Sequence, residues 1–305
     1  MDEPYAAICG ISEDEIRLQM KDDLGGLAKK LEITPEEALM KLKENYDGYH
    51  FTSPSPDIYN PFSLLNAFAD GKFGSYWFGS GTPTYLIKML NKFGVKPSEI
   101  GCKQLKSSVF DAPTETMTDA VPLLYQSGYI TIKDYNKMLD LYTLDIPNKE
   151  VRLGLMESLL PYYVNNKTPE ATTMVAYLFY DIQNGDMDAA LHRLQEFLST
   201  IPYCDNTRFE GHYQQVFYII FSLLGYYVDV EVRTPRGRVD IVLRTKTTLY
   251  VMELKLDKSA GEAMEQIDLK NYPERFALCG LPVVKVAVSF DSERCTIGGW
   301  EIINA

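Results

Sequence analysis

The apolar and polar positions of the first 200 residues predict mainly helices. Capping boxes, in which a serine or threonine stands three residues before a glutamate, open two of these helices, at Ser12 and at Thr34. A glycine pair, Gly25-Gly26, is expected to interrupt the first helix. Later helix starts carry asparagine, threonine or aspartate, in most cases beside a proline. The predicted helices cover residues 12–30, 35–45, 60–68, 82–93, 168–183 and 186–199.

Residues 121–164 show a different pattern. A short helix ends at Ser127-Gly128, and an alternating strand at 129–132 and a second strand at 139–144 follow it. Pro147 then begins another helix. A helix followed by a two-stranded ribbon is typical of a winged-helix unit, which binds DNA in some proteins and serves as a protein contact in others.

The last third of the chain alternates between helical and strand patterns. Ile201-Pro202-Tyr203 is a proline-marked connection, so we expect one domain at residues 1–200 and another at 203–305. This alternation predicts an α/β domain, and with the helical first part an α+β chain overall. The predicted helices cover residues 208–224 and 261–271, and the predicted strands, besides the hairpin described next, cover 226–232, 283–290 and 294–303.

The stretch from Gly237 to Lys255 carries the strongest chemical signal. Its two apolar runs, RVDIVL and TLYVMELKL, are joined by a short polar link at residues 245–248, a pattern that predicts an antiparallel hairpin. If the link closes symmetrically, Asp240 lies opposite Glu253. Lys255 follows Glu253 by two residues, so strand alternation places all three charged side chains on one face.

Two carboxylates placed opposite each other destabilise a sheet unless another charge compensates them. A divalent cation would do so, and carboxylate oxygens suit Mg²⁺ or Mn²⁺. In such a site the metal neutralises a scissile phosphate and acidifies its bound water, while a lysine orients or activates the attacking water. Asp240, Glu253 and Lys255 therefore predict metal-assisted phosphodiester hydrolysis. The alternative is that each is an ordinary charged residue at a strand edge or on the surface.

The spacing of Asp240 and Glu253-Leu254-Lys255 resembles the D…ExK core of the PD-(D/E)XK nuclease superfamily, and the resemblance covers about residues 203–305. It implies a restriction-endonuclease-like domain with a central mixed sheet flanked by helices. Val239 departs from the pattern, because the superfamily name has proline there. The resemblance implies metal ligation by Asp240, Glu253 and the Leu254 main-chain carbonyl, and supporting roles for Glu210, Gln266 and Tyr272.

Four segments of the first part, YDGYHF, YNPFSLLNAF, LLYQSGYITI and YTLDIPNKEVR, resemble the portion of AAA-ATPase-like proteins that follows their nucleotide-binding core. The resemblance implies that residues 1–200 are a helical lid and winged-helix region. The chain contains no P-loop sequence, so no ATP site is expected in it. Either it is a piece of a longer protein, or the protein has lost its ATPase core.

Charge and composition modify this picture. The net charge of −12 is unusual for a nucleic-acid binder, but residues from Tyr203 onward have 12 Lys and Arg against 14 Asp and Glu. Arg236 and Arg238, beside Arg233, form a basic cluster that contacts phosphate or is a solvated turn. Five dispersed cysteines and three histidines argue against disulfides and structural zinc. Without a membrane span or signal peptide, the chain is expected to be cytoplasmic.

Two functions follow. The first is a metal-dependent nuclease that hydrolyses phosphodiester bonds, with DNA favoured over RNA as substrate. The second is a catalytically inactive nuclease-like module that binds protein or nucleic acid within an ATPase-associated assembly. The intact Asp240, Glu253 and Lys255 favour the first, while the net acidity favours the second. An ATPase or another protein is a possible partner in either case, and no membrane is expected.

Overall fold

The structure is a computed structural model that describes residues 5–53, 55–80, 83–164, 168–201, 212–226, 229–233, 238–269, 280–294 and 296–304. The chain forms two compact units, residues 1–158 and 159–305. The expected mixed α+β class is confirmed, since helices accompany two separate sheets in the described residues. Within those residues, no helix combines the length and apolarity that a membrane crossing requires.

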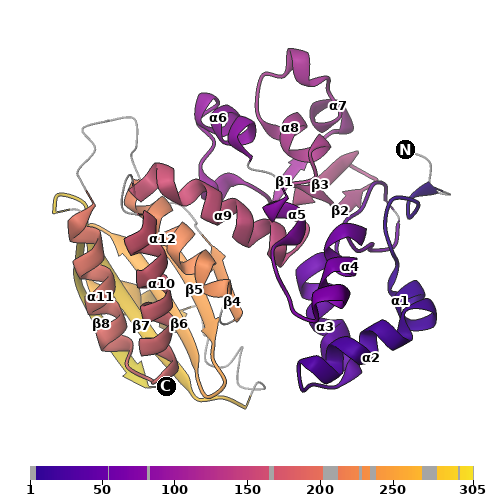
Figure 1. Ribbon diagram of the computed structural model, residues 1–305. Coiled ribbons are helices and arrows are strands. Elements are labelled where there is room, and N and C mark those ends of the chain that lie inside the picture. The colour runs from indigo at the N-terminus through magenta and orange to yellow at the C-terminus, as the bar shows by residue number, and fades with distance from the viewer. Residues whose placement is uncertain are drawn as a thin grey trace. The chain divides into compact units, whose positions relative to one another are not determined.

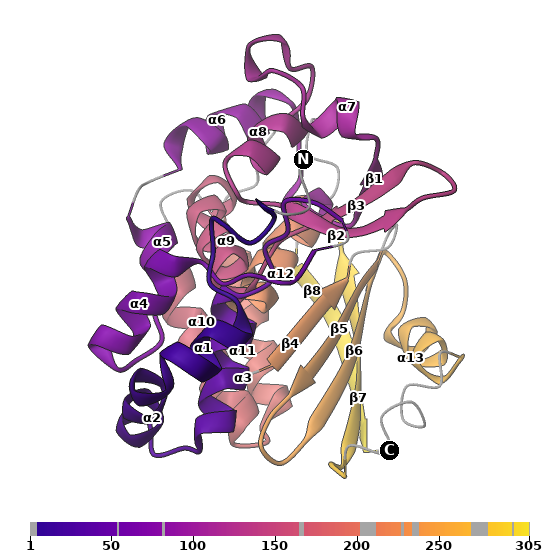
Figure 2. The ribbon, with the colours of Figure 1, turned by 90° about the vertical axis from the view of Figure 1, so that its right-hand side faces the viewer.

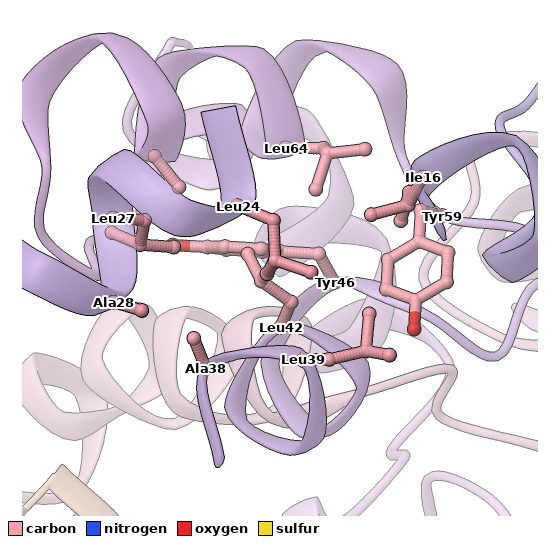
Figure 3. Packing of buried hydrophobic residues seen from close by; sticks show 11 residues of the cluster. Ile16, Leu24, Leu27, Ala28, Ala38, Leu39, Leu42, Tyr46, Tyr59 and Leu64 are labelled. Atoms are coloured by element: carbon pink, nitrogen blue, oxygen red, sulfur yellow. The ribbon is translucent and has the colours of Figure 1, made fainter. Parts of the chain in front are cut away.

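The first unit begins with a helical layer around one hydrophobic core (Figure 3). Both predicted capping boxes are present, because Ser12 and Thr34 each exchange hydrogen bonds with the glutamate three residues later. Buried Ile16, Leu42 and Tyr46 lie in the core. The helices are α1 (Glu13–Gln19), α2 (Lys21–Lys30), α3 (Pro35–Tyr46) and α4 (Pro61–Asp70).

One prediction for this layer is wrong. The chain breaks at Met20, between α1 and α2, and the glycine pair Gly25-Gly26 lies inside α2. The reason is tertiary packing, since Leu24 and Leu27 of α2 are buried in the core and hold the helix across the two glycines. Burial of an apolar face outweighs the helix penalty of about 1 kcal/mol that each glycine carries.

The rest of the first unit contains a small antiparallel sheet of order β1-β3-β2. The predicted helix and two-stranded ribbon are present as α8, β2 and β3, whereas β1, a strand of three residues, was not predicted. Whether the unit acts as a winged helix stays a prediction. The elements are α5 (Tyr76–Gly79), α6 (Thr84–Lys92), η2 (Pro97–Glu99), β1 (Lys103–Leu105), α7 (Ser107–Phe110), η3 (Thr114–Thr116), α8 (Val121–Gln126), β2 (Thr131–Asn136) and β3 (Leu141–Asp145), and α9 (Lys149–Val164) crosses the division between the units.

The second unit is built on a five-stranded sheet of order β4-β5-β6-β7-β8. Neighbouring strands are antiparallel except β6 and β7, which are parallel and are joined through α13. Helices α10, α11 and α12 lie on one face of the sheet and α13 on the other (Figures 1 and 2). The elements are α10 (Thr168–Gln183), α11 (Met187–Thr200), α12 (His212–Leu223), η5 (Leu224–Tyr226), β4 (Asp229–Arg233), β5 (Arg238–Arg244), β6 (Leu249–Leu256), α13 (Ala260–Leu269), β7 (Val283–Asp291) and β8 (Thr296–Asn304).

Helix α11 belongs to this second unit. Its Gln195 side chain donates a 2.7 Å hydrogen bond to the carbonyl of Ile297 in β8, and Trp300 donates a 2.8 Å bond to Asp188. The compact units divide at Ser158. The domain boundary near Ile201 stays a prediction.

Candidate active site

The candidate site is built on the hairpin of β5 and β6. The main-chain N–H of Thr245 donates to the carbonyl of Thr248 at 2.9 Å and closes the link. The Thr245 hydroxyl oxygen also accepts hydrogen bonds from the N–H groups of Thr247 and Thr248, which fixes the turn. The resulting register places Asp240 directly opposite Glu253. The predicted pairing of the two acids is confirmed.

Alternation along β6 places Glu253 and Lys255 on the face that α13 covers. Leu249 and Val251 precede them on the same face and pack with Ala263, Met264 and Ile267 of α13. On β5, Val242 packs against the same cluster, so Asp240, two residues earlier, shares that face as well. The three charged residues of the motif therefore belong to one face of the sheet.

The two acids differ little in burial. The Glu253 residue is 0% exposed and Asp240 is 8% exposed. One carboxylate oxygen of each, Oδ1 of Asp240 and Oε1 of Glu253, is buried. Burial of two carboxylates on facing positions is unfavourable, because each loses hydration and repels the other. Both residues have further interactions, and Arg233 of the edge strand β4 lies opposite Asp240 on its other side.

Lys255 is half-buried, and its ammonium is hydrogen-bonded to α13. The Nζ atom donates a 3.0 Å hydrogen bond to the main-chain carbonyl of Glu262 in the first turn of α13. Lys255 lies opposite Arg238 on β5 and beside Ser289 on β7. The ammonium of Lys255, near the end of β6, is thus held at the start of α13.

The remaining predicted site residues are placed only in part. Leu254 is opposite Val239 and beside Val288, with its side chain buried on the other face of the sheet. Gln266 is half-buried on α13. The backbone of Arg238 is described, whereas its side chain, and the residues Glu210, Tyr272 and Arg236, lie outside the described part of the chain. The roles of all these residues stay predictions.

The donor set suits a cation that needs few protein ligands. Among the described residues, no group of three or more His, Cys, Asp or Glu side chains is arranged to hold a metal ion. Mg²⁺ and Mn²⁺ are commonly bound through one or two carboxylates, with water and substrate phosphate as the other ligands. Two opposed carboxylates therefore fit a metal of this kind and do not fit a closed structural site.

Two residues near the site were missed from the sequence. Ser259 and Glu262 form a capping box that begins α13, in which Glu262 N–H donates to Ser259 Oγ at 3.2 Å and Ser259 N–H donates to Glu262 Oε2 at 3.1 Å. The signal was present, since a serine stands three residues before a glutamate ahead of an apolar helix. Their link to Lys255 arises only in the folded chain.

Comparison with known proteins finds a match for the part of the chain that contains the candidate site. Residues 208–300 match the family model described as PD-(D/E)XK nuclease superfamily, a range that includes β4 to β7, the first part of β8 and the three charged residues. The chain is 29% identical, over 99% of its length, to the "Uncharacterized protein in vnfD 5′ region" of Azotobacter chroococcum mcd 1. It spans 58% of the length of that relative. No solved structure matches the chain.

The match and the geometry agree on the same segment. The matched residues include most of the mixed five-stranded sheet, helices α12 and α13, and the two opposed acids on β5 and β6. Residues 208–300 of this chain thus match a domain of the PD-(D/E)XK nuclease superfamily.

Proposed function

We propose that this domain hydrolyses phosphodiester bonds of DNA with the help of a divalent cation, Mg²⁺ or Mn²⁺. The observation that carries the proposal is the direct opposition of Asp240 and Glu253, two buried acids on adjacent central strands. A fold has no structural need for such a pair, and sequences that serve stability alone avoid it. A cation that both carboxylates bind offsets the repulsion.

Each residue has a role in this proposal. Asp240 and Glu253 hold the cation, and the carbonyl of Leu254 is a third ligand. When bound, the cation supplies a positive charge for the scissile phosphate and acidifies a coordinated water. Lys255 orients the attacking water through its ammonium, which the Glu262 carbonyl already holds in place. Glu210 and Gln266 support the site.

The proposed substrate follows from the charge distribution. Two arginines lie close to the motif in the sheet: Arg233 is opposite Asp240, and Arg238 is opposite Lys255. With Arg236 they provide positive charge for phosphate contacts. This basic cluster offsets the acidity of the rest of the chain, and we expect binding to weaken as salt increases.

The alternative is a nuclease-like module that binds protein or nucleic acid and does not cleave. The full burial of Glu253 favours this alternative, because a ligand must reach its carboxylate. We further propose, from the sequence resemblance, that residues 1–200 correspond to the lid and winged-helix region of AAA-ATPase-like proteins.

A cleavage assay separates the two functions. The wild type is incubated with plasmid, single-stranded DNA and RNA in Mg²⁺ or Mn²⁺, beside Asp240→Ala and Lys255→Ala. The nuclease proposal predicts metal-dependent cleavage of DNA that both variants lose by at least about 100-fold. Equal cleavage by the wild type and the variants, or cleavage that persists in EDTA, would contradict it. The control is Lys246→Ala, which removes an exposed lysine at the hairpin turn.

A further inference from the structure

The start of α13 is tied to β6 by a hydrogen bond that the motif does not require. Lys255 Nζ donates to the carbonyl of Glu262 at 3.0 Å, so the position of the ammonium depends on where the first turn of α13 lies. A lysine has four rotatable side-chain bonds, and an ammonium that is not held samples many positions. The Glu262 carbonyl therefore restricts the Lys255 ammonium, which has the longest side chain of the three charged residues of the motif.

The Glu262 carbonyl is held in turn by the capping box. The Glu262 carboxylate accepts hydrogen bonds from the N–H of Ser259 at 3.1 Å and from its hydroxyl at 3.4 Å, and Glu262 N–H donates to Ser259 Oγ at 3.2 Å. The bond from the Ser259 N–H also lowers the pKa of Glu262. These reciprocal bonds fix the first turn, where the four N–H groups of a helix otherwise lack partners.

The connection that leads into α13 is anchored to the neighbouring strand. Asp257 accepts hydrogen bonds from the N–H of Ser292 at 2.8 Å and from its hydroxyl at 2.7 Å. Ser289 donates its hydroxyl proton to the carbonyl of Lys258 at 2.6 Å. Asp257 itself has a φ of +54°, an unfavourable value for a residue other than glycine. The connection is therefore built to a fixed shape.

We propose that Ser259 and Glu262 are positioning residues, which set the place of the Lys255 ammonium through the capped first turn of α13. The role of Lys255 in catalysis rests on the nuclease function proposed above. Neither residue is expected to touch the substrate. Their effect reaches the reaction through a single main-chain oxygen, so the side-chain chemistry matters only as far as it preserves the cap.

This reasoning defines two pairs of variants. Ser259→Ala and Glu262→Ala remove one half of the capping box each. Ser259→Thr and Glu262→Gln preserve it, because threonine and glutamine make the same pair of bonds. Thr34→Ala is the matched control, since Thr34 and Glu37 form an equal capping box at α3 in the other unit. Loss of either cap costs about 1 kcal/mol of stability.

The first measurement does not depend on cleavage. Lysines of the folded protein are modified with a limiting amount of an amine-reactive ester, and the modified fraction at Lys255 is read by mass spectrometry. Ser259→Ala and Glu262→Ala are expected to raise the rate at Lys255 severalfold, and Ser259→Thr, Glu262→Gln and Thr34→Ala are expected to leave it unchanged. An equal rate in all variants, or an increase in Thr34→Ala as well, would overturn the positioning role.

The second measurement is the rate of DNA cleavage in Mg²⁺. The two alanine variants at Ser259 and Glu262 are expected to lose about tenfold or more in kcat with KM unchanged, and the conservative variants to recover it. An unchanged kcat together with faster labelling would overturn the catalytic part of the proposal. A wild type that does not cleave, but labels as expected, would overturn the nuclease function and leave the hold on Lys255 supported.

Discussion

Glu253 lies directly opposite Asp240 across β5 and β6, and its other neighbour in the sheet is Ala287 of the parallel strand β7. Glu253 and Ala287 are both 0% exposed. The small alanine packs against α13 and leaves the acid between a carboxylate on one side and an apolar surface on the other. Two facing carboxylates are expected to destabilise the sheet, and a bound cation, as proposed above, would offset that cost.

Replacement of Glu253 tests this cost. Glu253→Gln keeps the shape of the side chain and removes one of two facing charges, so the free energy of unfolding in EDTA is expected to rise by about 1 kcal/mol. In Mg²⁺ the order is expected to reverse, because ligand binding stabilises only the wild type. Thermal unfolding in both buffers measures the effect. A variant that is less stable than the wild type in EDTA would show that Glu253 has a structural role.

Asp47 is a buried acid in the first unit and is expected to make the free energy of unfolding depend on pH. Burial raises its pKa to about 6, while the Gly48 N–H works in the opposite direction. The neighbouring charges are Asp57, Lys133 and Lys43, whose Nζ lies 3.9 Å from Asp47 Oδ2. The native state therefore binds the Asp47 proton more tightly than the unfolded state does, and this contribution to stability falls as the pH rises from about 4 to about 6.

Asp47→Asn is expected to raise the free energy of unfolding by an amount that depends on pH. The variant should exceed the wild type in free energy of unfolding by about 2 kcal/mol above pH 7, and the difference should vanish near pH 4. Urea unfolding at a series of pH values measures it. Asp22→Asn is the control, because Asp22 is exposed and is not among the charges that act on Asp47. A difference that does not change with pH would contradict the assignment.

Gly25 tests the explanation given for the unbroken α2. No atom lies within 4 Å of a Cβ built at Gly25, so alanine fits without a clash. Gly25→Ala is expected to stabilise the protein by about 0.5–1 kcal/mol, because alanine favours the helix and restricts the unfolded chain. Gly71→Ala is the contrasting variant, since Gly71 has a φ of +68° and a Cβ there would clash with Lys30. Thermal unfolding of both variants should show shifts of opposite sign.

Local signals made much of this fold predictable. The capping boxes at Ser12 and Thr34 fixed two helix starts, and the apolar runs around Lys246 fixed the hairpin and its register. A slip of one residue would have moved Asp240, together with the apolar residues on its face, to the other face of the sheet. Burial of one face therefore specifies the register strongly. The pairing of Asp240 with Glu253 followed from that register alone.

The features that the sequence did not predict are tertiary. The break at Met20 depends on which residues α2 buries, and β1 is too short to show a periodic pattern. The place of α11 on the sheet depends on contacts such as Gln195 with Ile297, which lie far apart in sequence. The bond from Lys255 to the Glu262 carbonyl is also invisible in the sequence, because it requires α13 to return over β6.

Cation binding tests the central proposal most directly. The protein is freed of metal and titrated with Mn²⁺ in a calorimeter, beside Asp240→Asn, Glu253→Gln and the control Asp57→Asn. The wild type and Asp57→Asn are expected to bind Mn²⁺ with the same affinity, and the two site variants to bind at least about tenfold more weakly. Equal affinity in all four proteins would contradict the proposal that Asp240 and Glu253 hold a cation together.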